Sequence, residues 1–298
     1  MRLVVTGATG QLGSELARSL ATLGEVIAFD RAGCDLARPQ RVREAMREAR
    51  PDIIVNAAAY TAVDRAETEE DLATALNGTA VAALADEAQR LGALLVHYST
   101  DYVFDGTKAA PYVESDAPCP LNAYGRSKLA GEQAIVARGG DYLVLRTSWL
   151  YAARGQNFVN TILRLARERE SLSVVDDQRG APTWARDLAG ATARILQQAE
   201  SERRGRSFVS GIYHVTAGGA ATWHDFARAI IEQYRALHPA ERLQAREIKP
   251  ISSAAFAAPA MRPKNSRLDG SALKTRFGIV LPQWDAALRL CLQELPHD

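Results

Sequence analysis

The sequence predicts an α/β protein with a doubly wound parallel sheet and a second, smaller lobe. Short apolar runs alternate with helical patterns through the first half of the chain, and glycines follow the first run directly. The runs are nearly continuous instead of alternating apolar with polar residues. Strands buried on both faces have this character, because helices cover both sides of a parallel sheet.

The first half supplies five strand-like runs. The first, at 3–5, ends at glycines, and leucines then recur at helical spacing from Leu12 to Leu23. The second ends at Asp30, and Pro39 suits the first turn of the helix after it. An alanine-rich helix over about 72–91 and a helix around Lys128 are also expected. The later strands are expected at 26–29, 53–55, 94–96 and 143–145.

The pattern loosens after about residue 170. A strand at 173–175, a helix over 188–196 and a polar link at 200–206 are expected, followed by a strand at 212–215 and an amphipathic helix at 223–234. Several prolines then interrupt short apolar pieces, which is typical of a loop-rich lobe. We therefore expect a first domain at 1–170, which 208–235 rejoins, and a second lobe at 171–207 and 236–298.

Composition excludes several classes of protein. The 298 residues carry 36 Lys+Arg against 35 Asp+Glu, so the net charge of +1 provides no basic field for nucleic acid. The three cysteines form no Cys-x-x-Cys pair, which argues against a disulfide framework and a zinc site. No apolar stretch has the length of a signal peptide or a membrane span. We expect a cytoplasmic protein that binds neither nucleic acid nor membranes.

Three glycines lie at three-residue intervals between the first strand and the first helix: Gly7, Gly10 and Gly13. Glycine allows a tight turn and a close approach of backbone N–H groups to a pyrophosphate at the helix N-terminus, as in the Rossmann fold. Asp30 closes the second strand, where a carboxylate can bind an adenosine ribose. Arg31 next to it can pair with a 2′-phosphate. The turn therefore predicts a dinucleotide cofactor, with NADPH and NADH both open.

Tyr124 and Lys128 are four residues apart, which places both on one face of a helix. A phenol has a reference pKa of about 10, and a neighbouring cation lowers it by stabilising the phenolate. We expect Lys128 to act on Tyr124 in this way. Thr100 follows the fourth strand, and ligands of such sheets bind at the carboxyl ends of strands. Thr100 and Tyr124 are therefore expected to converge.

Together these features resemble the extended short-chain dehydrogenase/reductase superfamily. Over nearly the whole chain the sequence is similar to its dTDP-4-dehydrorhamnose reductase family. The segments that carry this resemblance are 56–64, 99–106, 146–151, 177–183 and 262–268.

The resemblance implies NAD(P)H-dependent reduction of the C4 ketone of dTDP-4-dehydro-6-deoxy-L-mannose to dTDP-L-rhamnose, the last step of dTDP-rhamnose biosynthesis. It implies that Tyr124 donates a proton, that Lys128 also holds the nicotinamide ribose and that Thr100 hydrogen-bonds the reacting oxygen. The residues implied for the cofactor are Gly7, Gly10, Gln11, Leu12, Gly13, Asp30, Arg31, Asp35, Leu36, Ala58, Ala59, Tyr60, Tyr124 and Lys128. Those implied for the substrate are Thr100, Asp101, Tyr102, Trp149, Arg262, Asn265 and Arg267.

Two further expectations concern partners. The resemblance implies a homodimer, and some relatives hold Mg²⁺ by carboxylates at a dimer interface. Glu15 and Glu294 are the candidate ligands here, but Arg186 stands where such relatives have a further acid. A shared metal is therefore disfavoured.

Two other functions stay open at this point. A nucleotide-sugar epimerase uses the same Tyr and Lys. A non-catalytic, NADP-binding regulatory subunit that resembles the β subunit of methionine adenosyltransferase would bind the cofactor without consuming it. A 4,6-dehydratase is disfavoured, because Thr100 is followed by Asp101-Tyr102 and not by an Asp-Glu pair.

Overall fold

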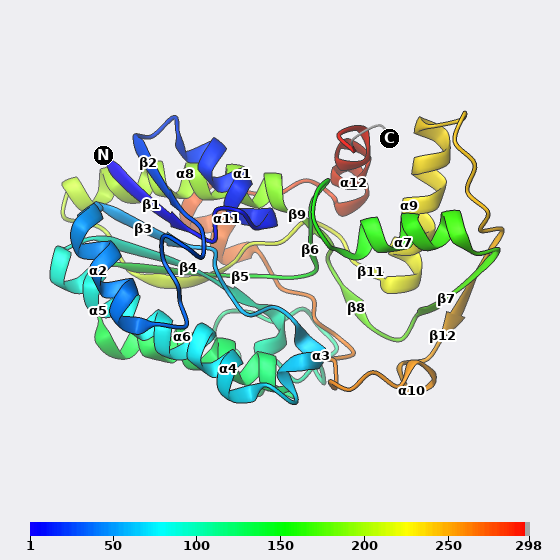
Figure 1. The fold of residues 1–298 in the computed structure, drawn as a ribbon, viewed down its shortest axis with the longest axis horizontal. Helices are drawn as coiled ribbons and strands as arrows, with labels where there is room; N and C mark the ends of the chain where they lie inside the picture. The colour runs from blue at the N-terminus through cyan, green and yellow to red at the C-terminus, as the bar shows by residue number, and fades with distance from the viewer. Residues whose placement is uncertain (296–298) are drawn as a thin grey trace.

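A six-stranded sheet forms the centre of the larger part of the molecule, which a computed structural model describes over residues 1–295 (Figure 1). The strand order is β10-β5-β4-β3-β1-β2, and every neighbouring pair is parallel. The predicted doubly wound sheet is thereby confirmed. Its strands are β1 (Arg2–Thr6), β2 (Glu25–Phe29), β3 (Ile53–Asn56), β4 (Leu94–Thr100), β5 (Tyr142–Thr147) and β10 (Gly211–His214).

Helices cover both faces of this sheet (Figure 1). One face packs against α1 (Gln11–Leu20), α8 (Ala185–Arg204) and α11 (Ser271–Phe277), and the other against α2 (Pro39–Ala49), α5 (Ala80–Leu91) and α6 (Ala123–Arg138). Leu3 and Val5 belong to the first apolar cluster, whereas Val4 belongs to the second. Because successive strand side chains point to opposite faces, both layers demand apolar residues. This explains the uninterrupted apolar runs in the sequence.

A π-helical turn lies beside the strand ends. After α3 (Val63–Ala66), the helix α4 (Glu70–Thr74) continues through the π-helical η1 (Ala75–Thr79) into α5. Asn77 in this turn accepts a hydrogen bond from Tyr60 N, donates to Tyr60 O and donates to the Ser127 hydroxyl. Single π-helical turns are frequent at functional sites. Here the turn ties the loop after β3 to helix α6.

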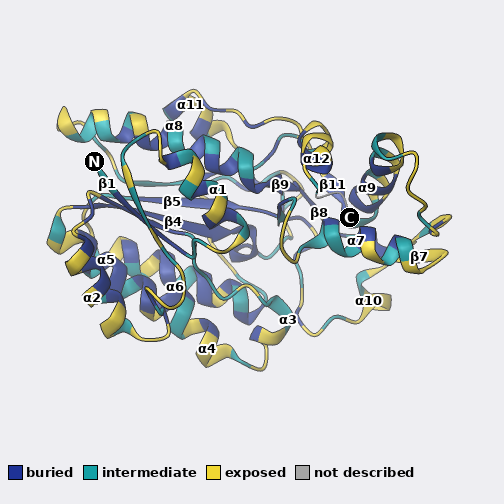
Figure 2. Cartoon of the chain, turned by 45° about the horizontal axis from the view of Figure 1, so that its top comes forward, coloured by how far each residue is buried: buried dark blue, intermediate teal, exposed yellow. Residues whose placement is uncertain are grey.

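The smaller part has its own apolar core, visible as the buried inner faces of its helices in Figure 2. Its helices α7 (Phe158–Glu168), α9 (Trp223–Leu237) and α12 (Trp284–Gln293) pack together with three two-stranded sheets. These sheets pair β6 (Leu150–Tyr151) with β9 (Thr183–Trp184), β7 (Ser171–Val175) with β12 (Glu247–Ile251), and β8 (Arg179–Gly180) with β11 (Ala221–Thr222). The short η2 (Asp101–Val103) and α10 (Ser253–Phe256) complete the chain's helices over the described residues.

The structure differs from the sequence prediction around 185–206. Helix α8 continues to Arg204, where a polar link was expected, because Arg203 is held by Asp141 and by the carbonyl of Gly92. Both α8 and α11 fall in the ranges predicted for the second lobe, but they pack against the large sheet. The predicted lobe boundaries stay a prediction. None of the helices within 1–295 is long and apolar enough to cross a membrane.

A buried ion pair fastens α6 to β5. The Arg146 guanidinium donates to both Glu132 carboxylate oxygens, at 2.9 and 2.6 Å, and both side chains are almost completely buried. Removing one charge of such a pair leaves the other uncompensated in a medium of low dielectric. We expect Glu132→Gln to lower the free energy of unfolding by about 3 kcal/mol in urea denaturation. Glu168→Gln, which breaks the exposed Arg164–Glu168 pair, should cost less than about 1 kcal/mol. Equal losses in the two variants would contradict this assignment.

Candidate active site

Most of the predicted site residues line one cavity of about 1040 Å³ at the carboxyl ends of the central strands. Sites for small molecules typically enclose about 300–1,000 Å³, so this cavity is at the upper end of that range. The predicted residues that line it are Gly7, Gly10, Gln11, Leu12, Asp30, Arg31, Asp35, Leu36, Ala58, Ala59, Tyr60, Thr100, Asp101, Tyr102, Tyr124, Lys128, Trp149 and Arg262.

The glycine turn leaves helix α1 without a side-chain cap. Gly7 has φ +68°, and a Cβ there would lie 2.8 Å from the backbone of Ala58. Gly10 is the N-cap residue and has no side chain to cap the helix. The first N–H groups of α1 therefore stay available at the cavity. Free N–H groups at a helix N-terminus fit a pyrophosphate. Gly13 lies outside the cavity lining, and a Cβ there would lie 2.0 Å from Gly7 O, so this glycine lets the helix pack on the turn.

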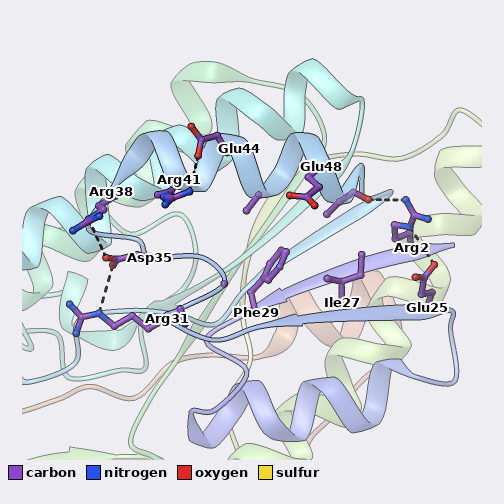
Figure 3. Close-up of a pocket in the computed structure, with 14 residues that line it drawn as sticks. Arg2, Glu25, Ile27, Phe29, Arg31, Asp35, Arg38, Arg41, Glu44 and Glu48 are labelled. Atoms are coloured by element: carbon purple, nitrogen blue, oxygen red, sulfur yellow. Dashed lines mark hydrogen bonds and ion pairs between the residues drawn. The ribbon is translucent and has the colours of Figure 1, made fainter.

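The side of the cavity that is predicted to bind the adenosine carries charges of both signs. Asp35 lies between Arg31 and Arg38, as Figure 3 shows. Its ion-pair distance to each is 3.8 Å. Asp30 accepts a hydrogen bond from Gly33 N. A second cavity of about 800 Å³, drawn in Figure 3, adjoins the first between β2 and α2 and shares Arg31 and Asp35 with it. Carboxylates suit a ribose and guanidinium groups suit a phosphate, so this side accommodates NADH and NADPH.

Helix α6 carries Tyr124 and Lys128 into the cavity. The Asn122 side chain caps the helix by accepting from Gly125 N, and the Tyr124 ring packs edge-on against Tyr102 at 5.9 Å between ring centroids. Gly125 allows close packing here, since a Cβ on it would lie 2.2 Å from Tyr102 O. Lys128 Nζ donates to Tyr98 O at 2.6 Å. The helix therefore places a phenol and an ammonium at the end of β4, beside Thr100.

Burial controls the protonation of these groups. It raises the pKa of Tyr124 above its usual value, and the neighbouring Asp101 adds to this. Burial also lowers the pKa of Lys128 to about 8, partly opposed by Glu132. The expected effect of Lys128 on the pKa of Tyr124 stays a prediction, because burial dominates the pKa of this phenol and the ammonium donates to Tyr98 O. Tyr124 is a neutral phenol near pH 7, which is the form that donates a proton.

The side of the cavity that is predicted to bind the substrate contains an aromatic pair that spans the two parts of the molecule. Trp149 stacks on Trp223 with ring centroids 3.5 Å apart and planes 4° from parallel. Trp223 belongs to α9, and its Nε1 donates to Gln178 Oε1. In the sequence, Trp223 stands only at the start of a predicted amphipathic helix, and no local motif marks it as a cavity residue. Apolar faces of this kind suit the C–H face of a sugar ring.

Arg262 also reaches the cavity, but Asn265 and Arg267 do not. Arg262 donates to both carboxylate oxygens of Asp64, at 2.9 Å each, and this holds the pKa of Asp64 below its usual range. Asn265 donates to the carbonyls of Lys108 and Ala110, and Arg267 donates to Asn265 and to the carbonyl of Ala109. These two side chains therefore hold the segment 108–110 in place. Their predicted contact with the nucleotide diphosphate stays a prediction.

Comparison with known proteins identifies the family. The model of the RmlD substrate binding domain matches residues 1–296. The dTDP-4-dehydrorhamnose reductase of Burkholderia thailandensis is 53% identical over 295 residues, covering 99% of both chains. That of Salmonella typhimurium is 46% identical, covering 99% of this chain and 98% of its own. The chain belongs to the RmlD family.

Solved structures agree with this RmlD family assignment. The dTDP-4-dehydrorhamnose reductase of Bacillus anthracis, solved in complex with NADP, superposes with a TM-score of 0.87 at 37% identity, covering 98% of this chain and 99% of its own. The UDP-glucose 4-epimerase of Thermus thermophilus, solved with NAD, has a TM-score of 0.80 at 21% identity and covers 99% of each chain. At that identity the likeness concerns the fold alone.

In this RmlD family member, the carboxylates predicted for Mg²⁺ are already neutralised. Arg186 pairs with Glu15 at 3.2 Å and with Glu294, so a guanidinium occupies the space between them. A divalent cation does not fit these residues as they stand, because it would face the positive charge of Arg186. A separate group, formed by Asp176, His224 and Asp225, brings its ligand atoms within 4.8 Å of one another. These side chains already bond Thr222 and the carbonyl of Ile248.

The buried Asp101 makes stability depend on pH in a way that a variant can test. Burial raises the pKa of Asp101 to about 7 in the folded protein, so the folded state holds a proton between about pH 4 and 7 that the unfolded state has lost. Stability contributed by this proton is lost as the pH rises. Asp101→Asn removes the effect, because an amide does not ionise. The free energy of unfolding should fall between pH 5 and pH 8 in the wild type. In the variant this fall should be smaller by about 2–3 kcal/mol, as measured by urea denaturation at each pH. Other titrating groups cancel in this comparison, and parallel pH profiles would contradict the assignment.

Proposed function

We propose that this chain reduces the C4 ketone of dTDP-4-dehydro-6-deoxy-L-mannose to dTDP-L-rhamnose with NADPH or NADH. One observation carries the proposal: the half-buried Tyr124 and the buried Lys128 stand beside Thr100 in the same cavity as the uncapped N-terminus of α1. A hydride donor and a ketone therefore have adjoining places within reach of an acid. The 53% identity to a named dTDP-4-dehydrorhamnose reductase supports the choice of sugar and nucleotide.

The protein groups supply what a ketone reduction requires besides the hydride, which the reduced nicotinamide provides. Tyr124 is protonated near pH 7 because burial raises its pKa, so it donates its proton to the developing alkoxide. The Thr100 hydroxyl lies at the same strand end and hydrogen-bonds the reacting oxygen. The Lys128 ammonium stabilises the phenolate that remains on Tyr124 and holds the ribose of the cofactor. The stacked Trp149 and Trp223 offer an apolar wall of the cavity on which the sugar ring can lie.

The other functions explain the site less well. A regulatory subunit that only binds NADP needs no buried acid, yet Thr100, Tyr124 and Lys128 all line the cavity. An epimerase would return its hydride to the sugar and consume no reduced cofactor. Net oxidation of NADPH by the keto-sugar separates the reductase from both alternatives. The proposal also places the chain in the cytoplasm, where nucleotide sugars and nicotinamide cofactors are available, while the homodimer stays a prediction.

Replacing the proton donor tests the assignment. Tyr124→Phe removes one hydroxyl from the cavity, so kcat for NADPH oxidation should fall about 10²- to 10⁴-fold while the Kd of NADPH stays close to that of the wild type. Absorbance at 340 nm with the keto-sugar made in situ measures the rate, and fluorescence titration measures binding. Tyr151→Phe is the matched control, because the Tyr151 hydroxyl is buried without a partner among residues 1–295 and lies outside the cavity. A Tyr124→Phe variant with nearly wild-type kcat would refute the role of Tyr124.

The pairing of Arg186 predicts that the activity needs no divalent metal. The guanidinium already supplies the positive charge between Glu15 and Glu294. Treatment with EDTA should leave kcat and KM unchanged, and later addition of Mg²⁺ should have no effect. A loss of activity in EDTA that Mg²⁺ restores would overturn this reasoning.

A further inference from the structure

A row of buried polar side chains runs behind Lys128 through the centre of the sheet. Thr6, Asn56 and His97 lie on the adjacent strands β1, β3 and β4 in direct register, Thr6 opposite Asn56 and Asn56 opposite His97. All three side chains are buried, with 1% exposure or less. Polar groups at the centre of a sheet are costly unless they are hydrogen-bonded. The mechanism described above uses none of the three.

Each member of the row contacts the next through its side chain. The Thr6 hydroxyl lies 2.6 Å from the Asn56 carboxamide oxygen, and the carboxamide nitrogen lies 2.9 Å from His97 Nδ1. His97 Nε2 lies 3.2 Å from Lys128 Nζ. The row therefore ends on the ammonium that Tyr124 requires. Gly131 on α6 faces the same ring nitrogen, and a Cβ there would lie 3.5 Å from it.

Donor and acceptor counting selects one arrangement of protons in this row. A lysine ammonium has only donors, so His97 Nε2 must be unprotonated to accept from it. The single ring proton of a neutral histidine then sits on Nδ1 and needs an acceptor on Asn56. Amide oxygen and nitrogen positions are distinguished by their hydrogen-bond partners. Turning the Asn56 carboxamide by 180° places its oxygen on His97 Nδ1–H and its nitrogen on the Thr6 hydroxyl, so each of these two contacts pairs a donor with an acceptor.

We propose that His97, held by Asn56 as the Nδ1–H tautomer, is a positioning residue that accepts a hydrogen bond from the Lys128 ammonium and so keeps Lys128 charged and directed into the site. The proposal rests on the proposed reductase function for its catalytic meaning. Lys128 has three N–H donors, of which Tyr98 O and His97 Nε2 take two. The third is left for the cofactor ribose. Without His97, the buried ammonium would lose one of its two acceptors in the protein.

Other charged groups around Lys128 do not substitute for His97. On its own helix, Glu132 raises the pKa of Lys128, but both of its oxygens are engaged by Arg146 of β5. The other titratable groups at this end of the cavity are Tyr98 on β4, Tyr124 on α6, and Asp101 and Tyr102 in η2. Among residues 1–295, hydrogen bonds to Lys128 Nζ are formed by His97 and by Tyr98 O. The ring of His97 is neutral, because burial and then the Lys128 charge hold its pKa well below the usual value.

Two substitutions separate this role from simple packing. His97→Leu removes the acceptor, so the pKa of Lys128 should fall by about 1–2 units, the worth of a hydrogen bond to a charged group. The decline of kcat at high pH, where Lys128 loses its proton, should move to lower pH by the same amount. His97→Gln retains an acceptor oxygen near the place of Nε2 and should restore most of the shift. His214→Leu is the matched control: His214 is also completely buried in the sheet, but the described residues show no hydrogen bond between its ring and Lys128.

Nuclear magnetic resonance of the full-length protein gives readouts that do not need the reaction. Two-bond ¹H–¹⁵N spectra of the five histidines report the tautomer of His97, and the ¹³Cε shift of Lys128 among the five lysines follows its titration. We expect Nδ1–H for wild-type His97 and a lower titration midpoint of Lys128 in His97→Leu than in His97→Gln or His214→Leu.

The outcomes distinguish the proposed role of His97 from the proposed reductase function. An Nε2–H tautomer of His97 in the wild type overturns the proposed role of His97. So does an equal titration midpoint of Lys128 in His97→Leu and in the wild type. If His97→Leu does not fold, the wild-type tautomer and the His97→Gln titration decide the question. If the wild type does not oxidise NADPH with the keto-sugar although the expected tautomer and midpoints are found, the proposed function fails and the contact between His97 and Lys128 stands.

Discussion

The burial of helix α6 against the end of β4 is the constraint on which the site depends. Two glycines permit it: a Cβ on Gly125 would lie 2.2 Å from Tyr102 O, and one on Gly131 would lie 2.3 Å from Asn77 O. Gly131 packs against the π-helical turn, whose Asn77 also holds Ser127. Larger residues would move the helix away from the sheet and admit water to Tyr124 and Lys128. The close packing of α6 and the chemistry of the site therefore both depend on Gly125 and Gly131.

This burial acts on every titratable group at the strand end, with a sign that depends on the charge type. It favours the neutral forms, so it raises the pKa of Tyr124 and Asp101 and lowers that of Lys128 and His97. For a reduction, a neutral phenol is the useful state, because it has a proton to give. A neutral lysine is not useful, so its charge must be retained by acceptors. Tyr98 O and His97 supply them without adding a negative charge that would repel the phenolate.

The sequence predicted the parts of the site that local spacing determines. The glycine turn and the Tyr124/Lys128 pair depend on contacts within one turn or one helix, so their residue intervals are sufficient evidence. The row of Thr6, Asn56 and His97 was not predicted, because it depends on the register of three strands that are 41 to 50 residues apart. Trp223 was missed for the same reason, since its stacking partner comes from the other part of the chain.

The second lobe shows the limit of reading residues by type. Arginine and asparagine near a phosphate-binding site suggest ligand contacts, but the same donors also satisfy backbone carbonyls of an irregular loop, and Asn265 and Arg267 do so here. The sequence alone does not show whether a ligand phosphate or a backbone carbonyl accepts the hydrogen bonds of these side chains.

Trp149 is the residue whose backbone links the two parts of the molecule. It has φ +46°, a conformation that costs a bulky residue energy, and it lies two residues after the end of β5. The stack on Trp223 and the contact with Gly180, where a Cβ would lie 2.4 Å from the Trp149 ring, hold this conformation in place. A strained residue persists only where its surroundings determine it. Here those surroundings come from β8 and α9, so the smaller lobe sets the position of an indole at the cavity of the larger one.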